Sequence, residues 1–232
     1  MPRRSKLNPL VLATSVFLFR AASVWAGEAA TTGLTVGEFA RMEKGEVVVK
    51  THTYATGGDD KRAARAIAYC LINKPPDAVW AVMLNYHQFN EFMPRLEKVQ
   101  VLEKTKNTMK VTQTVRVPLG VIRYTLDLIF KPAQRTVSWV LDKSRSHDIA
   151  DTFGAWEFLP YSQGKTVLRY TTTVDSGTVV PRFLEDFLIK NDLPEVLLSM
   201  RRRTESDGTW KKEPLDAWDQ LRPRERAGVA AP

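Results

Sequence analysis

Residues 96–175 alternate between apolar and polar side chains, and this period of two constrains the fold more than any other feature. The region contains six strand-like runs: KVQVLEK, TMKVTQTVRV, VIRYTLDLIFK, RTVSWVLDK, IADTFGAWEFLPY and KTVLRYTTTVDS. The breaks between the runs are short, as is typical of antiparallel neighbours. The sequence therefore predicts an antiparallel sheet with one apolar, aromatic face and one face in water.

The alternation also assigns individual side chains to the two faces of this sheet. Glu157 falls on the outer face. The inner face receives Gln113, Tyr124, Leu126, Leu128, Trp139, Trp156, Phe158, Tyr170 and Thr172. The polar members of this set are informative, because a buried polar group without a partner costs about 1–3 kcal/mol. A cavity with a few polar groups would accommodate them, and the alternative is a collapsed core in which they satisfy one another.

A helix and a strand are predicted near the N-terminal end of the fold. Thr35 and Glu38 have capping-box spacing, and Gly45 suits a helix C-terminus. These signals predict a helix over residues 36–44. The β-branched run EVVVKTHTY, residues 46–54, is typical of a strand.

A further strand at 65–73 is followed by the stretch PPDAVWAVMLNYHQFNEFMPRL, which is apolar and aromatic with little charge. Its second proline suits the first turn of a helix. The residue ahead of the later proline is disfavoured in the helical region, so a helix should end there. The stretch therefore predicts two short helices, at 77–84 and at about 86–92.

Apolar residues recur at helical spacing within residues 181–205, which predicts a long C-terminal helix that covers the apolar face of the sheet. Pro194 interrupts this pattern, while Asp192 and Glu195 again have capping-box spacing. The helix is therefore expected to be kinked or in two pieces. Residues 207–232 lack periodicity and are expected to form a mobile tail.

Residues 1–26 have the order of a cleavable export signal. The basic start MPRRSKL is followed by a short apolar run and by the small residues Val24 and Ala26 ahead of Gly27. The run is shorter than the roughly 20 residues that span a bilayer, so a signal peptide is preferred to an uncleaved anchor. Without the four basic residues of this segment, the formal net charge of +8 falls to +4. We therefore expect a periplasmic or secreted protein without a nucleic-acid partner.

The sequence shows no catalytic or metal-binding constellation. His52, His87 and His147 lack ligand spacing, and Cys70 is the only cysteine. No GxSxG, P-loop or dinucleotide fingerprint occurs, so we predict no metal, no cofactor and no catalytic residue. The arginines at 201–203 are explained either by the negative end of the helix dipole or by contact with anionic lipid head groups.

Three stretches carry a resemblance to a known family: INKPPDAVWAVMLNYHQFNEFMPRLEKVQVLEK, FGAWEFLP and VPRFLEDFLIKNDLPEVLLSMRRR. They resemble the START-like, polyketide cyclase/dehydrase superfamily, nearest its coenzyme Q-binding branch. The resemblance implies an α+β helix-grip fold, in which a curved antiparallel sheet of about seven strands wraps around the long C-terminal helix. Two short helices would follow the first core strand. The domain would span 27–206, with the first helix and strand as an extension.

The same resemblance implies a hydrophobic cavity between sheet and helix, to which Phe183 and Phe187 of the helix would contribute with the inner-face residues. We expect a carrier or binding protein for a lipid, quinone or polyketide-like molecule. The alternative is a cyclase- or aromatase-like enzyme, which needs only a shaped pocket and one or two polar groups. The loop at 176–183 either forms the entrance, with transient membrane contact, or packs over the helix end. The sequence leaves the oligomeric state open.

Overall fold

The computed structural model describes residues 32–55, 62–117, 120–175 and 192–214. The chain divides into two compact units, residues 1–46 and residues 47–232, and each is described by itself. Our expectations for the export signal, for the loop at 176–183 and for Phe183 and Phe187 lie outside the described residues.

The first unit contains helix α2, Val36–Glu43, close to its predicted bounds. The Thr35 N–H donates to a Glu38 carboxylate oxygen at 2.8 Å, and the Glu38 N–H donates to the Thr35 hydroxyl at 3.3 Å. Gly45 has a φ of 91° and donates its N–H to the Met42 carbonyl at 2.9 Å. The predicted capping box is confirmed, and a left-handed glycine ends the helix as expected.

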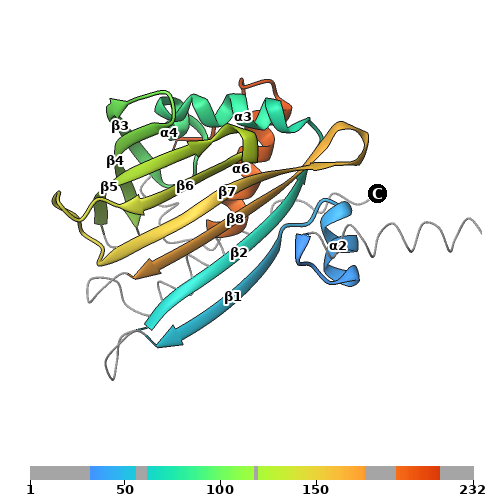
Figure 1. The fold of residues 1–232 in the computed structure, drawn as a ribbon, viewed down its shortest axis with the longest axis horizontal. Coiled ribbons are helices and arrows are strands. Elements are labelled where there is room, and N and C mark those ends of the chain that lie inside the picture. The colour runs from blue at the N-terminus through green and yellow to red at the C-terminus, as the bar shows by residue number, and fades with distance from the viewer. Residues whose placement is uncertain (1–31, 56–61, 118–119, 176–191, 215–232) are drawn as a thin grey trace, which may run out of the picture. The chain divides into compact units, whose positions relative to one another are not determined.

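The second unit is built on one antiparallel sheet in the strand order β1-β2-β8-β7-β6-β5-β4-β3. The strands are β1 Val48–Ala55, β2 Arg62–Ile72, β3 Leu96–Lys104, β4 Thr108–Val117, β5 Gly120–Lys131, β6 Thr136–Leu141, β7 Asp151–Tyr161 and β8 Lys165–Asp175. The described residues thus form eight strands where about seven were predicted, and the additional one is the extension strand β1. Because β2 pairs with β8, strands far apart in the sequence lie side by side (Figure 1).

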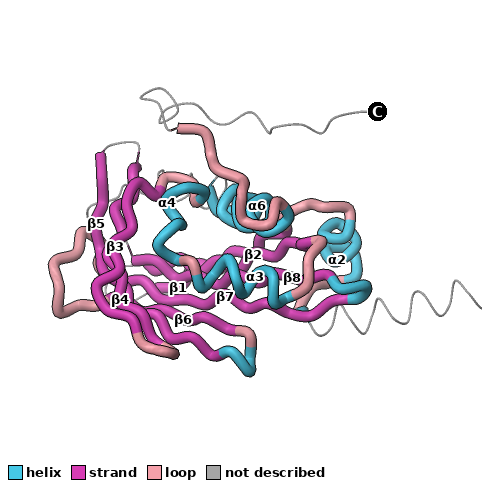
Figure 2. Tube along the Cα trace, turned by 90° about the horizontal axis from the view of Figure 1, so that it is seen from above, coloured by secondary structure: helices cyan, strands magenta, loops and turns pink. Residues whose placement is uncertain are grey.

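The helices of this unit gather on one face of the sheet. They are α3 Pro76–Leu84, the 3-10 turn η1 Tyr86–Gln88, α4 Phe89–Phe92 and α6 Leu193–Glu205, while two further 3-10 turns, η2 Pro132–Gln134 and η3 Ser162–Gly164, lie in the connections between strands. Figure 2 shows α3, α4 and α6 on the same side of the sheet, and α6 contacts β2, α3 and α4. The predicted α+β helix-grip plan is confirmed, including the two short helical segments after the first core strand.

The start of α6 differs from its prediction in one respect. Pro194 lies in the first turn of α6, as expected for the second piece of a two-piece helix, and the residues predicted to form a first piece lie outside the described ranges. The predicted capping box is wrong, because the Asp192 side chain makes no capping hydrogen bond. Its carboxylate instead pairs with the Arg95 guanidinium, so it joins α6 to the turn that follows α4.

The assignment of residues to the two faces of the sheet is confirmed on the central strands. Trp156 and Phe158 of β7 belong to the buried apolar core. Glu157, between them, pairs on the other face with its cross-strand partner Arg169, whose Nε donates to a Glu157 carboxylate oxygen at 2.5 Å. The register of β7 is therefore the one that the alternation predicts.

Candidate functional site

A cavity of about 260 Å³ lies between the inner face of the sheet, the turn after α4 and the start of α6. Seven of the predicted residues line it: Gln113, Tyr124, Leu126, Trp139, Trp156, Tyr170 and Thr172. They come from β4, β5, β6, β7 and β8, which pair in this order and so place one set of inward-pointing side chains on a continuous surface. At this end of the sheet, the open cavity is therefore found instead of the collapsed core.

Two other predicted residues, Leu128 and Phe158, are fully buried but are not part of the lining. The Phe158 ring lies edge-on to Trp80 of α3, with centroids 5.9 Å apart. Leu128 belongs to the same apolar cluster. The sheet is thus packed solidly under α3 and hollow toward its other end. Periodicity indicates only which face a residue occupies, so it could not separate these two zones.

An aromatic surface forms one side of the cavity. Trp139 stacks on Tyr170 with ring centroids 5.3 Å apart, and Trp156 lies against Tyr170 at 4.1 Å. Gly154 lies opposite Trp139 in the strand register. A Cβ at Gly154 would fall 2.4 Å from the Trp139 ring and 2.2 Å from the carbonyl oxygen of Thr171. The glycine of the FGAWEFLP stretch is therefore required for Trp139 to lie over the β7 backbone.

Among the described lining residues, the uncharged polar side chains are three tyrosines, one glutamine and two threonines. Gln113 donates from Nε2 to the Tyr86 hydroxyl at 2.6 Å. Burial raises the pKa of Tyr170 to about 12. Burial, with a smaller contribution from neighbouring phenols, also raises the pKa of Tyr86 and of Tyr124 above the ordinary value. At neutral pH all three phenols are uncharged, so they can donate or accept hydrogen bonds without contributing charge.

One ion pair closes the rim of the cavity. Among the described lining residues, Arg95 and Asp192 alone are charged, and they pair with each other. Arg95 has a φ of 56°, a left-handed conformation that is uncommon for a residue with a side chain. The pair leaves the described lining without net charge.

The helical side of the cavity was not identified from the sequence. It is formed by Tyr86, Phe89, Met93, Pro94, Arg95 and Leu96. A signal was present, because the stretch that contains these residues is apolar and aromatic with little charge. Helices of three and four residues cannot bury all of that surface against one neighbour. Val115, Val117 and Ile122 also line the cavity and share the strand parity of the predicted set.

The described residues show no constellation for catalysis by metal or nucleophile. They contain no group of three potential metal ligands. Cys70 is buried, and burial raises the pKa of its thiol to about 12, so the thiol stays protonated. His147 contacts the Ile149 carbonyl through Nδ1 at 2.7 Å, and neither His147 nor His87 lines the cavity. Across the described ranges, no helix is both long and apolar enough to cross a membrane.

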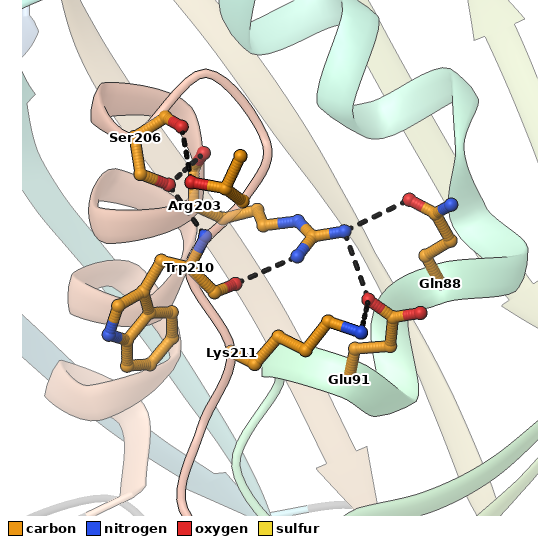
Figure 3. Close-up of polar contacts among 7 residues, drawn as sticks. Gln88, Glu91, Arg203, Ser206, Trp210 and Lys211 are labelled. Carbon is orange, nitrogen blue, oxygen red and sulfur yellow. Dashed lines mark hydrogen bonds and ion pairs between the residues drawn. The ribbon is translucent and has the colours of Figure 1, made fainter.

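The arginines at 201–203 do not form a common surface patch. The Arg203 side chain is buried, and the whole residue is 4% exposed. Its guanidinium donates to the Gln88 side chain at 3.0 Å, to the Glu91 carboxylate at 3.1 Å and to the Trp210 carbonyl at 2.8 Å (Figure 3). Contact with lipid head groups is therefore excluded for Arg203 in this conformation.

The helix-grip fold of the second unit agrees with the comparison with known protein families. The family of polyketide cyclases/dehydrases and lipid transport proteins matches residues 72–201. This match covers more than half of the chain, and the protein belongs to that family. The resemblance to the superfamily is thereby confirmed, while placement in its coenzyme Q-binding branch stays a prediction. No curated protein sequence matches the chain at a significant level.

Solved structures share the fold at low sequence identity. An aromatase/cyclase from a Streptomyces species has a TM-score of 0.53 and 17% identity, over 69% of this chain and 94% of that one. A STAR-related lipid transfer protein from Xanthomonas axonopodis has a TM-score of 0.54 and 14% identity, over 67% and 93% of the two chains. A START superfamily protein from Mycobacterium smegmatis has a TM-score of 0.51 and 12% identity, over 70% and 99%. These similarities establish the fold alone.

Proposed function

We propose that the protein binds and carries a hydrophobic small molecule in the cavity between the sheet and α6, after export to the periplasm or the cell exterior. The observation that supports this proposal is the lining itself. Its aromatic surface offers apolar contact, and its phenols and amide offer a few hydrogen bonds at fixed positions. Pockets for small molecules have this composition, mostly apolar with a few polar groups that orient the ligand.

The size of the cavity limits the part of the ligand that it can enclose. A cavity of about 150 Å³ lined by aliphatic and aromatic side chains takes up benzene. The volume of about 260 Å³ found here therefore suits a fused two-ring system or a short branched chain. A longer molecule would extend past the Arg95–Asp192 rim.

The electrostatics favour an uncharged ligand. The tyrosines are neutral, and Arg95 is already paired with Asp192. A carboxylate or phosphate inside the cavity would lose its hydration without gaining a counter-ion, at a cost of several kcal/mol. A carbonyl or hydroxyl oxygen would instead be received by Gln113 and the phenols. We infer that the enclosed part of the ligand is neutral and carries oxygen.

The same electrostatics favour a carrier over the cyclase-like alternative. A general base should have a pKa near the working pH, whereas the phenols that line the cavity have raised pKa values. Near neutral pH they can orient a substrate or donate a hydrogen bond, but they cannot accept a proton as phenolates. The cavity therefore fits binding without turnover better than it fits acid–base chemistry.

The test compares two probes of nearly equal shape, 2-acetylnaphthalene and 2-naphthoate, through quenching of the tryptophans in the cavity wall. The neutral ketone should bind at least about 100-fold more tightly than the carboxylate at neutral pH, because each 1.4 kcal/mol corresponds to a factor of ten. Tyr124→Phe should weaken ketone binding about five- to tenfold through loss of one hydrogen bond. Tyr161→Phe, outside the lining, is the matched control and should leave it unchanged.

Different results would contradict ligand binding in this cavity and the neutrality of the ligand. Absence of saturable binding for both probes would contradict ligand binding in this cavity. Equal or tighter binding of the carboxylate would contradict the neutral-ligand inference and leave the carrier function in place. Chemical conversion of the ketone or of a related substrate that depends on Tyr124 would favour the cyclase-like enzyme.

A further inference from the structure

The chain reverses after α6 and returns along α4 as a segment that we call the C-terminal strap, residues 206–213. Gly208, at a φ of 82°, donates its N–H to the Arg203 carbonyl at 2.8 Å. The Trp210 N–H donates to the Ser206 hydroxyl at 2.8 Å (Figure 3). Both bonds bend the strap back toward the last turn of α6. The strap is therefore an ordered continuation of the domain beyond the helix.

Arg203 joins three elements at this point. Its guanidinium, from α6, donates to the Trp210 carbonyl of the strap and to Gln88 and Glu91 beside the cavity wall. It also lies over the Phe92 ring of α4 at 5.2 Å. A buried guanidinium with all these partners fixes the distance between α6, α4 and the strap, because removal of any partner would leave charge or polar atoms without compensation.

Lys212, in the same strap, contacts the backbone of residues that line the cavity. Its ammonium donates to the carbonyls of Met93 and Leu96, each at 2.7 Å. Its backbone N–H donates to the Glu91 carbonyl at 3.0 Å. Carbonyls at the end of a short helix lack partners within the helix, and a positive charge there is favourable. Lys212 supplies both donors and charge to the end of α4.

The two carbonyls that Lys212 binds enclose a turn, residues 93–96, that we call the wall turn. All four of its residues line the cavity, and one of them, Arg95, holds a left-handed backbone conformation. Such a conformation is strained and persists only where surrounding contacts impose it. The contacts here include Lys212 on one side and the Arg95–Asp192 pair on the other, together with the Arg116 N–H, which donates to the Arg95 carbonyl at 2.8 Å.

We propose that Lys212 is a positioning residue for the ligand cavity: it touches no ligand, but it holds the wall turn in the shape that completes the cavity. This inference rests on the proposed function, because it concerns the same cavity. It assigns a role to the C-terminal strap, which would control how readily the wall opens for ligand exchange.

The experiment compares Lys212→Met with Lys211→Met in the purified protein. The two lysines are adjacent, but Lys211 is 65% exposed at its side chain and pairs with the Glu91 carboxylate alone, at 3.3 Å. Amide hydrogen exchange is measured residue by residue at Met93, Leu96 and Arg116. The Met93 N–H donates from the wall turn to the Phe89 carbonyl of α4, the Leu96 N–H donates to the Pro94 carbonyl, and the Arg116 N–H donates to the Arg95 carbonyl. Lys212→Met should raise exchange there about tenfold, and Lys211→Met less than about twofold. Lys212→Arg, which keeps charge and donors, should restore slow exchange.

Amides of β7 and β8 serve as the internal reference and should exchange at wild-type rates in all three variants. Equal rates at the wall turn in the two methionine variants would overturn the inference, and so would a uniform rise that includes β7 and β8. With 2-acetylnaphthalene bound, Lys212→Met should also release the probe about tenfold faster than Lys211→Met does. If wild-type protein binds no probe, the proposed function fails, while the exchange data still decide the role of Lys212.

Discussion

The two walls of the cavity are held in place in different ways. The sheet wall, on β4 to β8, is fixed by ladders of backbone hydrogen bonds between neighbouring strands. The wall turn receives one backbone hydrogen bond from β4, from the Arg116 N–H to the Arg95 carbonyl, and is otherwise held by side chains from far along the chain. Lys212 reaches the Met93 carbonyl across 119 residues of sequence. We infer that the sheet wall sets the shape of the site, whereas the wall turn is the part that can yield when a ligand enters or leaves.

The largest expected effect tests the sheet wall. Trp156 is 5% exposed and contacts Tyr170 and Trp139. Trp156→Ala should lower the free energy of unfolding by about 3–5 kcal/mol, because it removes a large buried ring. Chemical denaturation measures the change. A loss below about 1 kcal/mol would show that the sheet wall is not a rigid, packed surface.

Arg203 tests the support of the other wall. Arg203→Met removes one partner of a buried ion pair and should destabilise the fold by about 3 kcal/mol. Arg202 is its neighbour on α6, 38% exposed at the side chain and paired with Glu195 at 2.7 Å. Arg202→Met should cost at most about 1 kcal/mol. Similar losses in the two variants would indicate that Arg203 gives the wall turn no special support.

Gly154 tests whether the shape of the sheet wall depends on close packing. Gly154→Ala should cost about 1–3 kcal/mol, because the new methyl group meets the Trp139 ring and the Thr171 carbonyl oxygen. It should also displace Trp139 and weaken binding of 2-acetylnaphthalene. Wild-type unfolding and binding in this variant would mean that the two strands adjust freely. Gly164→Ala is the control. Gly164 has a φ of 72° and open space where a Cβ would lie, so this substitution introduces backbone strain without a packing clash.

The smallest expected effect is on the stability of the fold at alkaline pH, which depends on the buried phenols of the cavity wall. The phenol of Tyr170 has a pKa of about 12 in the folded protein and an ordinary value of 10.0. The folded state therefore holds its proton more tightly, so the stability it confers is complete below pH 10 and is lost as the pH rises toward 12. Tyr170→Phe should make this part of the stability curve less steep, and the contributions of Tyr86 and Tyr124 should remain. An unchanged curve would place the Tyr170 phenol in water.

The sheet wall could be predicted because its information is local and repeated. A period of two, sustained over six runs, fixes which side chains point inward, and Gln113, Tyr124 and Trp156 lie where it indicates. The same periodicity could not show that Phe158 is packed under α3 while Trp156 borders the cavity. That difference depends on where Trp80 meets the sheet.

The wall turn and the strap could not be predicted because their contacts have no periodicity. Asp192 had the spacing of a capping residue, but an arginine distant in sequence provides a stronger partner for its carboxylate. The segment KKEPLD after the last helix is polar and irregular, which are also features of a mobile tail. Only the structure shows that Lys212 meets two backbone carbonyls.

The measurement that tests the central claim most directly is mass spectrometry of what the protein carries. Protein purified from its native compartment is kept intact for native mass spectrometry, and a second sample is extracted with organic solvent. We expect a bound hydrophobic molecule in roughly stoichiometric amount, with an uncharged oxygen-bearing part and no carboxylate or phosphate within the enclosed portion. Protein that consistently carries no ligand, or that carries fatty acids bound through their carboxylates in the cavity, would contradict this account.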